Sequence, residues 1–420
     1  MNKVQQLKEQ GYTMIEMAIV IFIIVILSTI LFANYHGINR KGEVLNYSEK
    51  LKRDLRQAQN YSLNLKMFDS FAYGWGIKVD RTTNSYTVFA DKDNDKKYSY
   101  PVKLLIHGDE YESGVTFNES SKTGDKIGNN EAGRVVNISG TPNQTSGGGR
   151  PDSSSGYWEF KNVGDYLEID DNETDINNDF DFLLADFVID LWFDASIDGN
   201  KRSIICKWDE NNIANQSFHC YKTSSNEIEC SVRANSEYYS VKSGVISSGW
   251  NHLAFVRKGR YIKLYLTNEG TGIQEESIEE WSDLIDGSIE DNDINVQIGS
   301  CQGDSASSDW NGDIDEIRIA KGMYYWDRKF DLPQVQHKAD EEKFKTISLP
   351  PGVIFYRLMV AESEYKDSLD IYFFRDDLSM YIDGATGDKA NVILNNIGDE
   401  DMLRDLEIEP SGLIKLITPL

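Results

Sequence analysis

Several features that mark common enzymes and nucleic-acid-binding proteins are missing from this 420-residue chain. It has no G-x-S-x-G turn, no Gly-Lys phosphate-binding loop and no dinucleotide-binding glycine pattern, so the enzyme classes built on those motifs are not indicated. Its four cysteines show no C-x-x-C spacing and its five histidines are scattered, which argues against a structural zinc site. Basic residues are also scarce, 43 against 69 acidic ones. A net charge of -26 repels nucleic acid, and no nucleic-acid partner is expected.

The composition is that of a globular protein. Hydrophobic residues make up 40% of the chain and aromatic residues 11%, enough for a sizeable core. The length favours two or three domains.

The N-terminal region combines a basic leader with an apolar segment. Residues 1–11 read MNKVQQLKEQG, and between Met17 and Ala33 only Ser28 and Thr29 are not apolar. A run of about 20 apolar residues is long enough to cross a bilayer as one helix, and we predict a transmembrane segment at 14–36. The leader lysines predict a cytoplasmic N-terminus with the rest of the chain outside.

An ordinary secretory signal fits poorly, because its cleavage site would follow the apolar segment. Here Gly11 precedes that segment, Tyr12 comes next, and Glu16 is the fifth residue after the glycine. This arrangement resembles the N-terminal signal of type IV prepilins and pseudopilins, which usually have Phe where this chain has Tyr12. The resemblance implies that a prepilin peptidase removes the leader 1–11 after Gly11 and that the new N-terminus, Tyr12, is methylated.

Glu16 stands at the start of the apolar segment. A carboxylate in hydrocarbon costs several kcal/mol unless it is paired, so it indicates function. In pilins the implied partner is the α-amine of a neighbouring subunit, which would give Glu16 a role in filament assembly. The alternative is a simple single-pass anchor with an acid at the membrane interface.

The helix is predicted to continue to residue 66, giving one helix over 12–66. Apolar or small residues recur at spacings of three and four among charged ones, which indicates an amphipathic helix with one face to cover. These residues are Leu51, Leu55, Ala58, Ser62 and Leu65. Pilins lay such a helix against a small antiparallel sheet.

Two segments resemble the β-head of a minor pilin or pseudopilin. Residues 67–101 contain an alternating pattern that predicts a hairpin around residues 82–84. Residues 339–420 contain four further strand patterns: KTISLPPGVIF, LDIYFFRDDLSMYIDG, ANVILNN and LEIEPSGLIKLI. About 240 residues separate the two segments, and a loop tip tolerates such an insertion when its ends lie close together.

The intervening residues 102–338 consist of short alternating stretches separated by Gly, Asn, Asp and Ser turns, which predicts a β-sandwich. Several stretches resemble the laminin G-like, concanavalin A-like family. The matching residues are Phe160, Gly164, Tyr166, Leu167, Trp192, Trp250, His252, Phe255, Arg257, Gly299, Gly312, Asp315, Glu316 and Arg318. The expected fold class is therefore an α+β pilin fold, a long N-terminal helix plus antiparallel sheet, with an inserted all-β concanavalin A-like jelly-roll sandwich.

In that family Trp250 and His252 are expected to pack on a strand face, and Asp315, Glu316 and Arg318 to form a turn and an ion pair of the scaffold. The resemblance covers nearly the whole insert and is informative about fold, much less about function.

The loop DKDNDKKY precedes the insert. Asp91, Asp93 and Asp95 alternate in it, as in loops that wrap calcium with oxygen ligands, but Lys96 replaces the turn glycine of an EF-hand. A calcium site and a solvated acidic turn both remain open, and no other cofactor is expected.

The segment SFHCYKTSSNEIECSVRA reads as a hairpin centred on Ser225. Cys220 and Cys230 are equidistant from that centre, so they would lie opposite each other at nearly the separation a disulfide needs. A second pair, Cys206 with Cys301, is left open by the spacing.

Glu168, Asp170 and Glu173 spell E-x-D-x-x-E, a spacing found in some retaining glycosidases of the same broad sandwich class. Here the triplet leaves its strand after Asp170 for a polar turn, so we do not expect an enzyme.

Three functions follow from these features. The first is a minor pilin or pilin-like subunit displaying a lectin-like domain that adheres to glycan or protein surfaces. The second is a structural pseudopilin of a type II secretion-like machine, with the insert as spacer or docking module. The third is a membrane-anchored glycosidase. The expected location is the bacterial inner membrane, single-pass with the C-terminus outside, and then an extracellular filament or the cell surface. The expected partners are other pilin subunits, prepilin peptidase and a glycan or surface protein.

Overall fold

The protein is described by a computed structural model. It covers residues 14–68, 72–92, 96, 102–108, 116–118, 135–151, 153–171, 180–270, 274–276, 285, 287–322, 342–361, 364–374, 380–382, 385–386, 388–396 and 399–417. Within these ranges, the backbone alone is described for residues 30–41, 118, 274–276, 364, 385–386 and 399–402. The chain divides into two compact units. The first comprises Met1–Leu63, Gly76–Val88 and Lys345–Leu420, and the second comprises Asn64–Trp75 and Phe89–Phe344.

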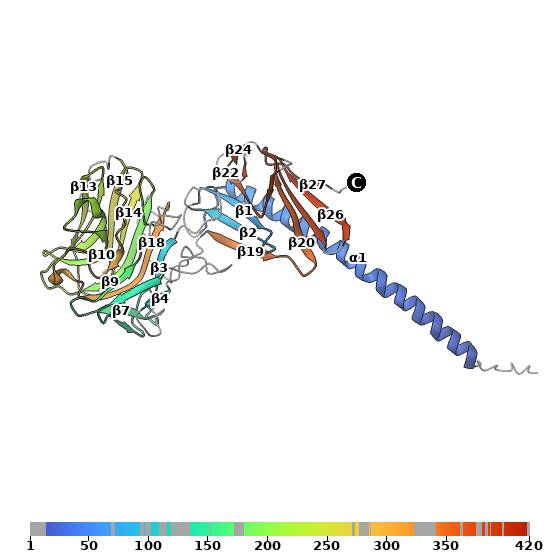
Figure 1. Cartoon of the computed structure of the whole chain (residues 1–420), viewed down its shortest axis with the longest axis horizontal. Helices are drawn as coiled ribbons and strands as arrows, with labels where there is room; N and C mark the ends of the chain where they lie inside the picture. The colour runs from blue at the N-terminus through green and yellow to red at the C-terminus, as the bar shows by residue number, and fades with distance from the viewer. Residues whose placement is uncertain are drawn as a thin grey trace, which may run out of the picture. The chain divides into compact units, whose positions relative to one another are not determined.

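The first unit contains one long helix, α1 (Met14–Leu63), drawn in blue in Figure 1. Its buried stripe follows the predicted spacing of three and four residues and consists of Leu51, Leu55, Ala58 and Ser62. The predicted end at residue 66 is wrong. Leu65 lies beyond the helix with a φ of 52° and is 47% exposed, because the chain has already turned away from the helix axis.

Side-chain hydrogen bonds tie the second half of α1 to the sheets of its own unit. The hydroxyl of Ser62 donates to the backbone oxygen of Phe373 at 2.5 Å. The Asp54 carboxylate accepts hydrogen bonds from the Tyr86 hydroxyl at 2.7 Å and from Nζ of Lys345 at 2.8 Å. These polar contacts fix the rotation of the helix, while the apolar stripe supplies the burial.

The first half of α1 has a different surface. Its large apolar side chains between Met14 and Leu27 are all exposed, from 42% for Ile26 to 92% for Met14. Within the part of the chain that the structure describes, no helix meets the combined length and hydropathy criteria for a membrane span. The predicted span 14–36 includes residues 30–36, whose side chains lie outside those described.

Two sheets hold the strands of the first unit, and the residues of three of these strands that lie in 74–75, 89–91 and 343–344 are assigned to the second unit. The six-stranded sheet has the order β19-β2-β1-β22-β23-β24. Its strands are β19 (Lys343–Ser348), β2 (Ser85–Asp91), β1 (Gly74–Asp80), β22 (Ser368–Phe374), β23 (Met380–Ile382) and β24 (Ala385–Thr386). The five-stranded sheet has the order β21-β20-β25-β26-β27. Its strands are β21 (Glu364–Lys366), β20 (Val353–Val360), β25 (Ala390–Asn396), β26 (Asp399–Ile408) and β27 (Ile414–Ile417).

The second unit is an all-β jelly-roll sandwich, so the predicted sandwich is confirmed. One of its two sheets has the order β13-β12-β11-β10-β17-β8-β5-β4. The strands are β13 (Glu237–Val245), β12 (Glu227–Ala234), β11 (Gln216–Lys222), β10 (Arg202–Trp208), β17 (Val296–Ile298), β8 (Tyr166–Ile169), β5 (Val135–Ser139) and β4 (Thr116–Asn118). We call this the β10 sheet.

The facing sheet has the order β16-β15-β14-β9-β18-β7-β6, with β3 also pairing with β18. The strands are β16 (Gln274–Glu276), β15 (Tyr261–Asn268), β14 (Asn251–Lys258), β9 (Phe187–Ala195), β18 (Gly312–Lys321), β7 (Tyr157–Phe160), β6 (Asn143–Thr145) and β3 (Val102–Ile106). We call this the β14 sheet. Two short 3-10 helices, η1 (Ile213–Asn215) and η2 (Ala306–Ser308), lie in the connections.

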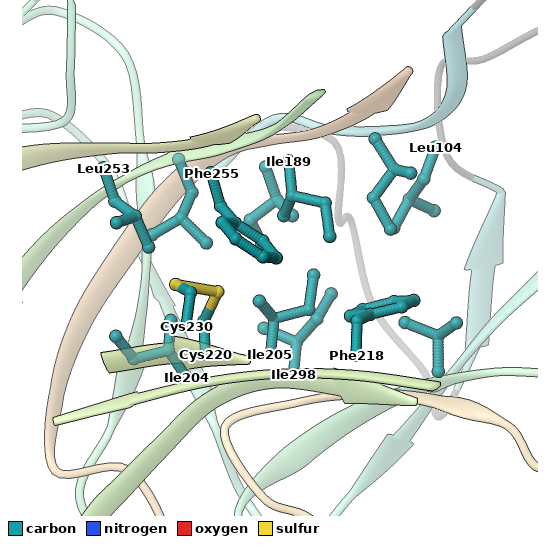
Figure 2. Close-up of a cluster of buried hydrophobic side chains, with 14 of the residues drawn as sticks. Leu104, Ile189, Ile204, Ile205, Phe218, Cys220, Cys230, Leu253, Phe255 and Ile298 are labelled. Carbon is teal, nitrogen blue, oxygen red and sulfur yellow. A yellow bond between two sulfur atoms is a disulfide. The ribbon is translucent and has the colours of Figure 1, made fainter. Parts of the chain in front are cut away.

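The core of this unit lies between the two sheets (Figure 2). Side chains such as Ile189, Leu253 and Phe255 from the β14 sheet meet Ile205 and Phe218 from the β10 sheet. In regular strands such as β11, with Phe218 and Cys220, and β12, with Ile228, Cys230 and Val232, every second residue faces this layer, which gives these strands their alternating sequence pattern.

The division of the chain differs from the predicted boundaries at 101/102 and 338/339. Residues 64–66 of the predicted helix, and residues 67–75, 89–101 and 339–344 of the predicted pilin β-head, fall in the second unit. Among them, Phe68, Trp75 and Phe344 form an aromatic cluster with ring centroids 5.4 to 5.8 Å apart. These ring contacts join residues distant in sequence, which no strand pattern could have shown.

Candidate functional site

The predicted processing and assembly residues lie at the start of the chain. Gly11 and Tyr12 lie outside the described residues. Glu16 is in the first turn of α1 and its side chain is exposed. A carboxylate in the first turn also interacts favourably with the positive end of the helix dipole.

Of the three predicted calcium ligands, Asp93 and Asp95 lie outside the described residues. Asp91 is the last residue of β2 and is fully buried. Its carboxylate accepts a hydrogen bond from the backbone N–H of Lys96 at 3.3 Å. The Asp91 carboxylate therefore stabilises its own turn, and the calcium interpretation stays a prediction.

The acidic triplet is only partly described, because Glu173 lies outside the described residues. The Glu168 carboxylate accepts a hydrogen bond from the side-chain amide of Gln297 at 2.8 Å, and that of Asp170 accepts one from Asn295 at 3.1 Å. Both acids thus have amide partners from the chain around β17.

The predicted scaffold residues are mostly engaged in structural contacts. The Trp192 and His252 rings lie 5.0 Å apart and both side chains are buried. Arg318 makes an ion pair with Asp190 on β9, in which two guanidinium nitrogens donate to the two carboxylate oxygens at 2.7 and 2.9 Å. Glu316 contacts Nδ1 of His107 at 2.5 Å. Trp250 is half-buried, and its ring packs against that of Tyr157 at 5.6 Å.

Both cysteine pairs are disulfides. Cys220 and Cys230 are partners in the register of β11 and β12, as the hairpin spacing predicts, and their disulfide lies in the core between the sheets (Figure 2). The second pair, Cys206 with Cys301, joins β10 to the chain that follows β17. Cys206 and Cys301 form a separate small cluster with Trp208.

The candidate functional site is the outer surface of the β10 sheet, the side opposite the core. On β11, His219 and Tyr221 alternate with the core residues Phe218 and Cys220. On β12, Glu229, Ser231 and Arg233 alternate in the same way with Cys230 and Val232. Because side chains alternate across a strand, these residues share the outer surface. We define the aromatic face as Trp208, His219, Tyr221, Glu229, Arg233 and Tyr238.

The rings of this face form a continuous strip across four strands. Trp208 on β10 lies 6.0 Å from Tyr238 on β13 and 6.1 Å from His219 on β11. His219 lies 4.8 Å from Tyr221. Trp208 is 4% exposed and Tyr238 is 45% exposed, so Trp208 forms the floor of the strip and Tyr238 its accessible edge.

Cations lie over two of the rings in the strip. The guanidinium carbon of Arg233 is 5.7 Å from the centre of the Trp208 ring, and Nζ of Lys201 is 4.9 Å from that of Tyr221. Such cation–π contacts hold long side chains in place and contribute about 0.5–1 kcal/mol each at exposed sites. They order the polar groups around the rings.

Glu229 organises the centre of the face. The Tyr238 hydroxyl donates to its carboxylate at 3.0 Å, and Nζ of Lys242 contacts it at 3.1 Å. Burial acts to raise the pKa of Glu229, but hydrogen bonds from Tyr221, Lys242 and Tyr238 outweigh it, and the pKa lies below its ordinary value. Burial raises the pKa of Tyr221, which keeps its hydroxyl a neutral donor.

Ser203, His219 and Glu210 form a chain in the order of a serine-hydrolase triad. Nε2 of His219 is 3.1 Å from the Ser203 hydroxyl, and its Nδ1 is 3.8 Å from the Glu210 carboxylate. However, Ser203 is fully buried and its hydroxyl also donates to Asp304 at 2.8 Å. A nucleophile must be reachable and free to lose its proton to the histidine, so this geometry favours a structural role.

His219, Cys301 and Asp304 also bring one ligand atom each to within 4.8 Å of one another. The sulfur of Cys301 is bonded to Cys206, so it is not available as a thiolate. Burial, with a smaller effect of Lys201, lowers the pKa of His219 well below its ordinary value. With the Cys301 sulfur in a disulfide, only His219 and Asp304 of this group could act as ligands, which is too few for a metal site.

The residues of the aromatic face were not among the predicted site residues. The signal was present in HCYK and ECSVRANSEYYS, where aromatic and charged residues alternate with the two cysteines. Strand pairing was needed to show that Trp208 and Tyr238, on strands three positions apart in the sheet order, lie in one strip. The exposed Tyr238 ring beside ordered hydrogen-bonding groups suits binding of a ligand with both apolar and hydroxyl surfaces.

Comparisons with known proteins agree with this fold. A protein-family model described as the concanavalin A-like lectin/glucanases superfamily matches residues 161–324. This stretch of the second unit is thus a laminin G-like, concanavalin A-like domain. No curated protein matches the chain.

Solved structures with detectable similarity include three sugar-related or extracellular modules. Domain 4 of AbnA, a GH43 extracellular arabinanase from Geobacillus stearothermophilus, in complex with arabinotriose, is 14% identical, with 53% of this chain and 92% of that chain covered and a TM-score of 0.30. The Ruminococcus gnavus IT-sialidase CBM40 bound to α2,3-sialyllactose is 15% identical, with 39% and 88% covered and a TM-score of 0.27. Domains LG4-5 of the mouse laminin α1 chain are 16% identical, with 37% and 42% covered and a TM-score of 0.26.

Proposed function

We propose that this protein is a minor type IV pilin-like filament subunit whose lectin-like domain binds glycans on a surface. The observation that carries the glycan-binding part is the aromatic face, a strip of rings with fixed hydrogen-bonding groups on one sheet of a concanavalin A-like domain. Sugar rings have an apolar C–H face and a rim of hydroxyls. The Tyr238 ring would contact the apolar face of the sugar. Arg233 and the groups hydrogen-bonded to Glu229 would contact its hydroxyls.

The filament part rests on α1. One half of the helix is tied to the sheets of its unit, and the other half exposes large apolar side chains around its surface. Exposed apolar surface of this extent indicates a binding partner. We infer that this half first anchors the chain in the bacterial inner membrane, with the C-terminus outside, and then packs against other subunits after prepilin peptidase acts at Gly11 and Tyr12. Glu16 would then set the register between subunits.

The binding test uses the full-length chain in detergent micelles on a glycan array, followed by calorimetry with and without calcium. We expect saturable glycan binding by the parent chain and an affinity loss of about tenfold or more for Tyr238→Ala, the size typical of an accessible aromatic contact. The matched control is Tyr365→Ala, which removes an exposed tyrosine (62% exposed) from the first unit. Equal binding by Tyr238→Ala and the parent would argue against the aromatic face.

A deletion of residues 102–335 separates the biological alternatives. Lost attachment with intact filaments supports the adhesive subunit. Retained attachment with lost protein secretion supports a pseudopilin whose insert is a spacer or docking module. Hydrolysis of a bound glycan that Glu173→Gln abolishes would instead indicate a glycosidase.

A further inference from the structure

We infer that the aromatic face prefers acidic glycans, that is, sugars carrying a carboxylate, and that Arg233 is the group that recognises it. This inference rests on the proposed glycan-binding function and specifies its ligand class. The observation behind it is an arginine that is held rigidly on the face and whose positive charge is not balanced by any carboxylate among the described residues.

Three contacts fix the Arg233 side chain. Its Nε donates to the side-chain oxygen of Gln216 at 2.7 Å, and one terminal nitrogen donates to the backbone oxygen of Ser236 at 2.7 Å. Its guanidinium lies over the ring of Trp208. All three partners are neutral, so the contacts orient the group without cancelling its charge.

The other cations of this region are balanced. Lys201 lies 2.6 Å from Glu210 and 3.2 Å from Asp304, Lys242 lies 3.1 Å from Glu229, and Lys222 lies 3.1 Å from Asp198. Arg202 also pairs with Asp198. Within the described part of the β10 sheet, Arg233 thus differs from its neighbours, although the chain has 69 acidic residues to pair with 43 basic ones.

A second observation points to the same place. The Trp208 ring, over which the guanidinium lies, belongs to a residue that is 96% buried, and its indole Nε1 has no hydrogen-bond acceptor among the described residues. A buried donor without a partner costs free energy, so the described residues leave one hydrogen bond unmade next to Arg233. A ligand that brings an anionic oxygen to the guanidinium supplies the negative charge that no described carboxylate places there.

The surroundings fit a carboxylated sugar better than a small anion. Tyr238 is the register partner of Arg233 on β13 and is the most accessible ring of the face. A sugar ring stacked on Tyr238 would place a carboxylate substituent beside the guanidinium. Arginine binds a planar carboxylate through two parallel hydrogen bonds, which lysine cannot do.

The test compares matched sugar pairs on the full-length chain in detergent micelles: lactose against sialyllactose, and galactose oligomers against galacturonic acid oligomers. A sulfated lactose serves as an anionic ligand without a carboxylate. The variants are Arg233→Gln, which removes the charge, and Arg233→Lys, which keeps the charge but cannot form two parallel hydrogen bonds to a carboxylate. The control is Arg81→Gln, which removes one positive charge from the first unit and leaves the aromatic face unchanged.

We expect the parent chain and Arg81→Gln to bind the carboxylated member of a pair at least tenfold more tightly than the neutral one. Arg233→Gln should bring that ratio close to one with the neutral affinity retained, and Arg233→Lys should retain part of it. Equal binding of both members by the parent chain overturns the inference while the proposed glycan binding stands. An unchanged ratio in both Arg233 variants, or tighter binding of sulfated than carboxylated lactose, also overturns it. If no sugar binds, both the inference and the proposed function fail.

Discussion

The hydroxyl of Tyr86 in β2 donates a 2.7 Å hydrogen bond to the carboxylate of Asp54 in α1, and both side chains are buried. Burial first, and the hydrogen bond to Asp54 second, raise the pKa of Tyr86 well above its ordinary value. The hydroxyl is therefore a neutral donor at every pH of interest. This contact is one of the polar links between the helix and the strands of the first unit.

Replacing Asp54 with Ala should lower the free energy of unfolding by about 1–3 kcal/mol, because it leaves the buried Tyr86 hydroxyl without an acceptor. Denaturant unfolding followed by circular dichroism gives the change. Tyr86→Phe removes the donor as well, so the double variant should lose less than the sum of the two single ones. Arg81→Ala, at an exposed ion pair with Asp367, should change stability by about 0.5 kcal/mol or less. Strict additivity of Asp54→Ala and Tyr86→Phe would contradict the link.

The two disulfides should contribute unequally to stability. Cys206 and Cys301 are 95 residues apart and Cys220 and Cys230 only 10. In the chain-entropy model, removing the disulfide that closes the longer loop lowers the free energy of unfolding by about 4–5 kcal/mol. Removing the one that closes the shorter loop lowers it by about 3 kcal/mol, before any cavity in the core is counted. Unfolding of the paired Cys→Ala variants measures both. A non-reducing peptide map that finds four free thiols would refute the assignment.

Asp313 should make the second unit less stable as the pH rises. Its register partners are Glu159 and Asp194, and burial followed by the charges of those two acids raises its pKa from 3.8 to about 6. A carboxyl whose pKa is higher in the folded state does not reduce the free energy of unfolding at pH values below its unfolded pKa of 3.8. It reduces that free energy by the full amount at pH values above about 6.

Asp313→Asn should therefore stabilise the protein at pH 8 and not at pH 3.5. Because the group is partly exposed, we expect a gain of about 1–2 kcal/mol. Thermal unfolding across pH 3.5 to 8 tests this, with Glu237→Gln, an exposed acid at the start of β13, as control. A gain of equal size at both ends of that range would rule out the electrostatic cause.

Gly11→Ala should block removal of the leader, because a processing enzyme must approach the backbone closely there and a side chain obstructs it. Mass spectrometry of the N-terminus in the native host gives the answer. A mature N-terminus at Tyr12 in the variant would contradict the prediction.

Glu16→Ala should reduce filament assembly without affecting insertion of α1 into the membrane. The variant lacks the carboxylate that would pair with the neighbouring subunit, while the apolar surface of the helix is unchanged. Sheared-filament yield and membrane fractionation measure the two properties separately. Glu16→Asp serves as control, since it keeps the charge, and a normal filament yield from Glu16→Ala would exclude the pairing role.

Local pattern was sufficient for the parts of the fold that depend on neighbours in sequence. The buried stripe Leu51, Leu55, Ala58 and Ser62 follows from helical spacing, and the alternation in β11 and β12 places Cys220 opposite Cys230. Helix periodicity and hairpin symmetry are properties of short segments, so a single sequence contains them. The sequence did not predict the helix end at Leu63. The backbone turns to a left-handed conformation at Leu65, and leucine, unlike glycine or asparagine, does not indicate such a turn.

The candidate site depended on contacts that no local pattern encodes. Arg318 pairs with Asp190, 128 residues away, instead of the acids beside it. The aromatic face exists only because β10, β11, β12 and β13 lie side by side, which brings Trp208 and Tyr238 into contact. The sequence by itself determined the helix, the hairpins, the sandwich class and the cysteine pair within one hairpin. The tertiary structure decided which outward side chains meet, because sheet order and register are set by packing of the whole core.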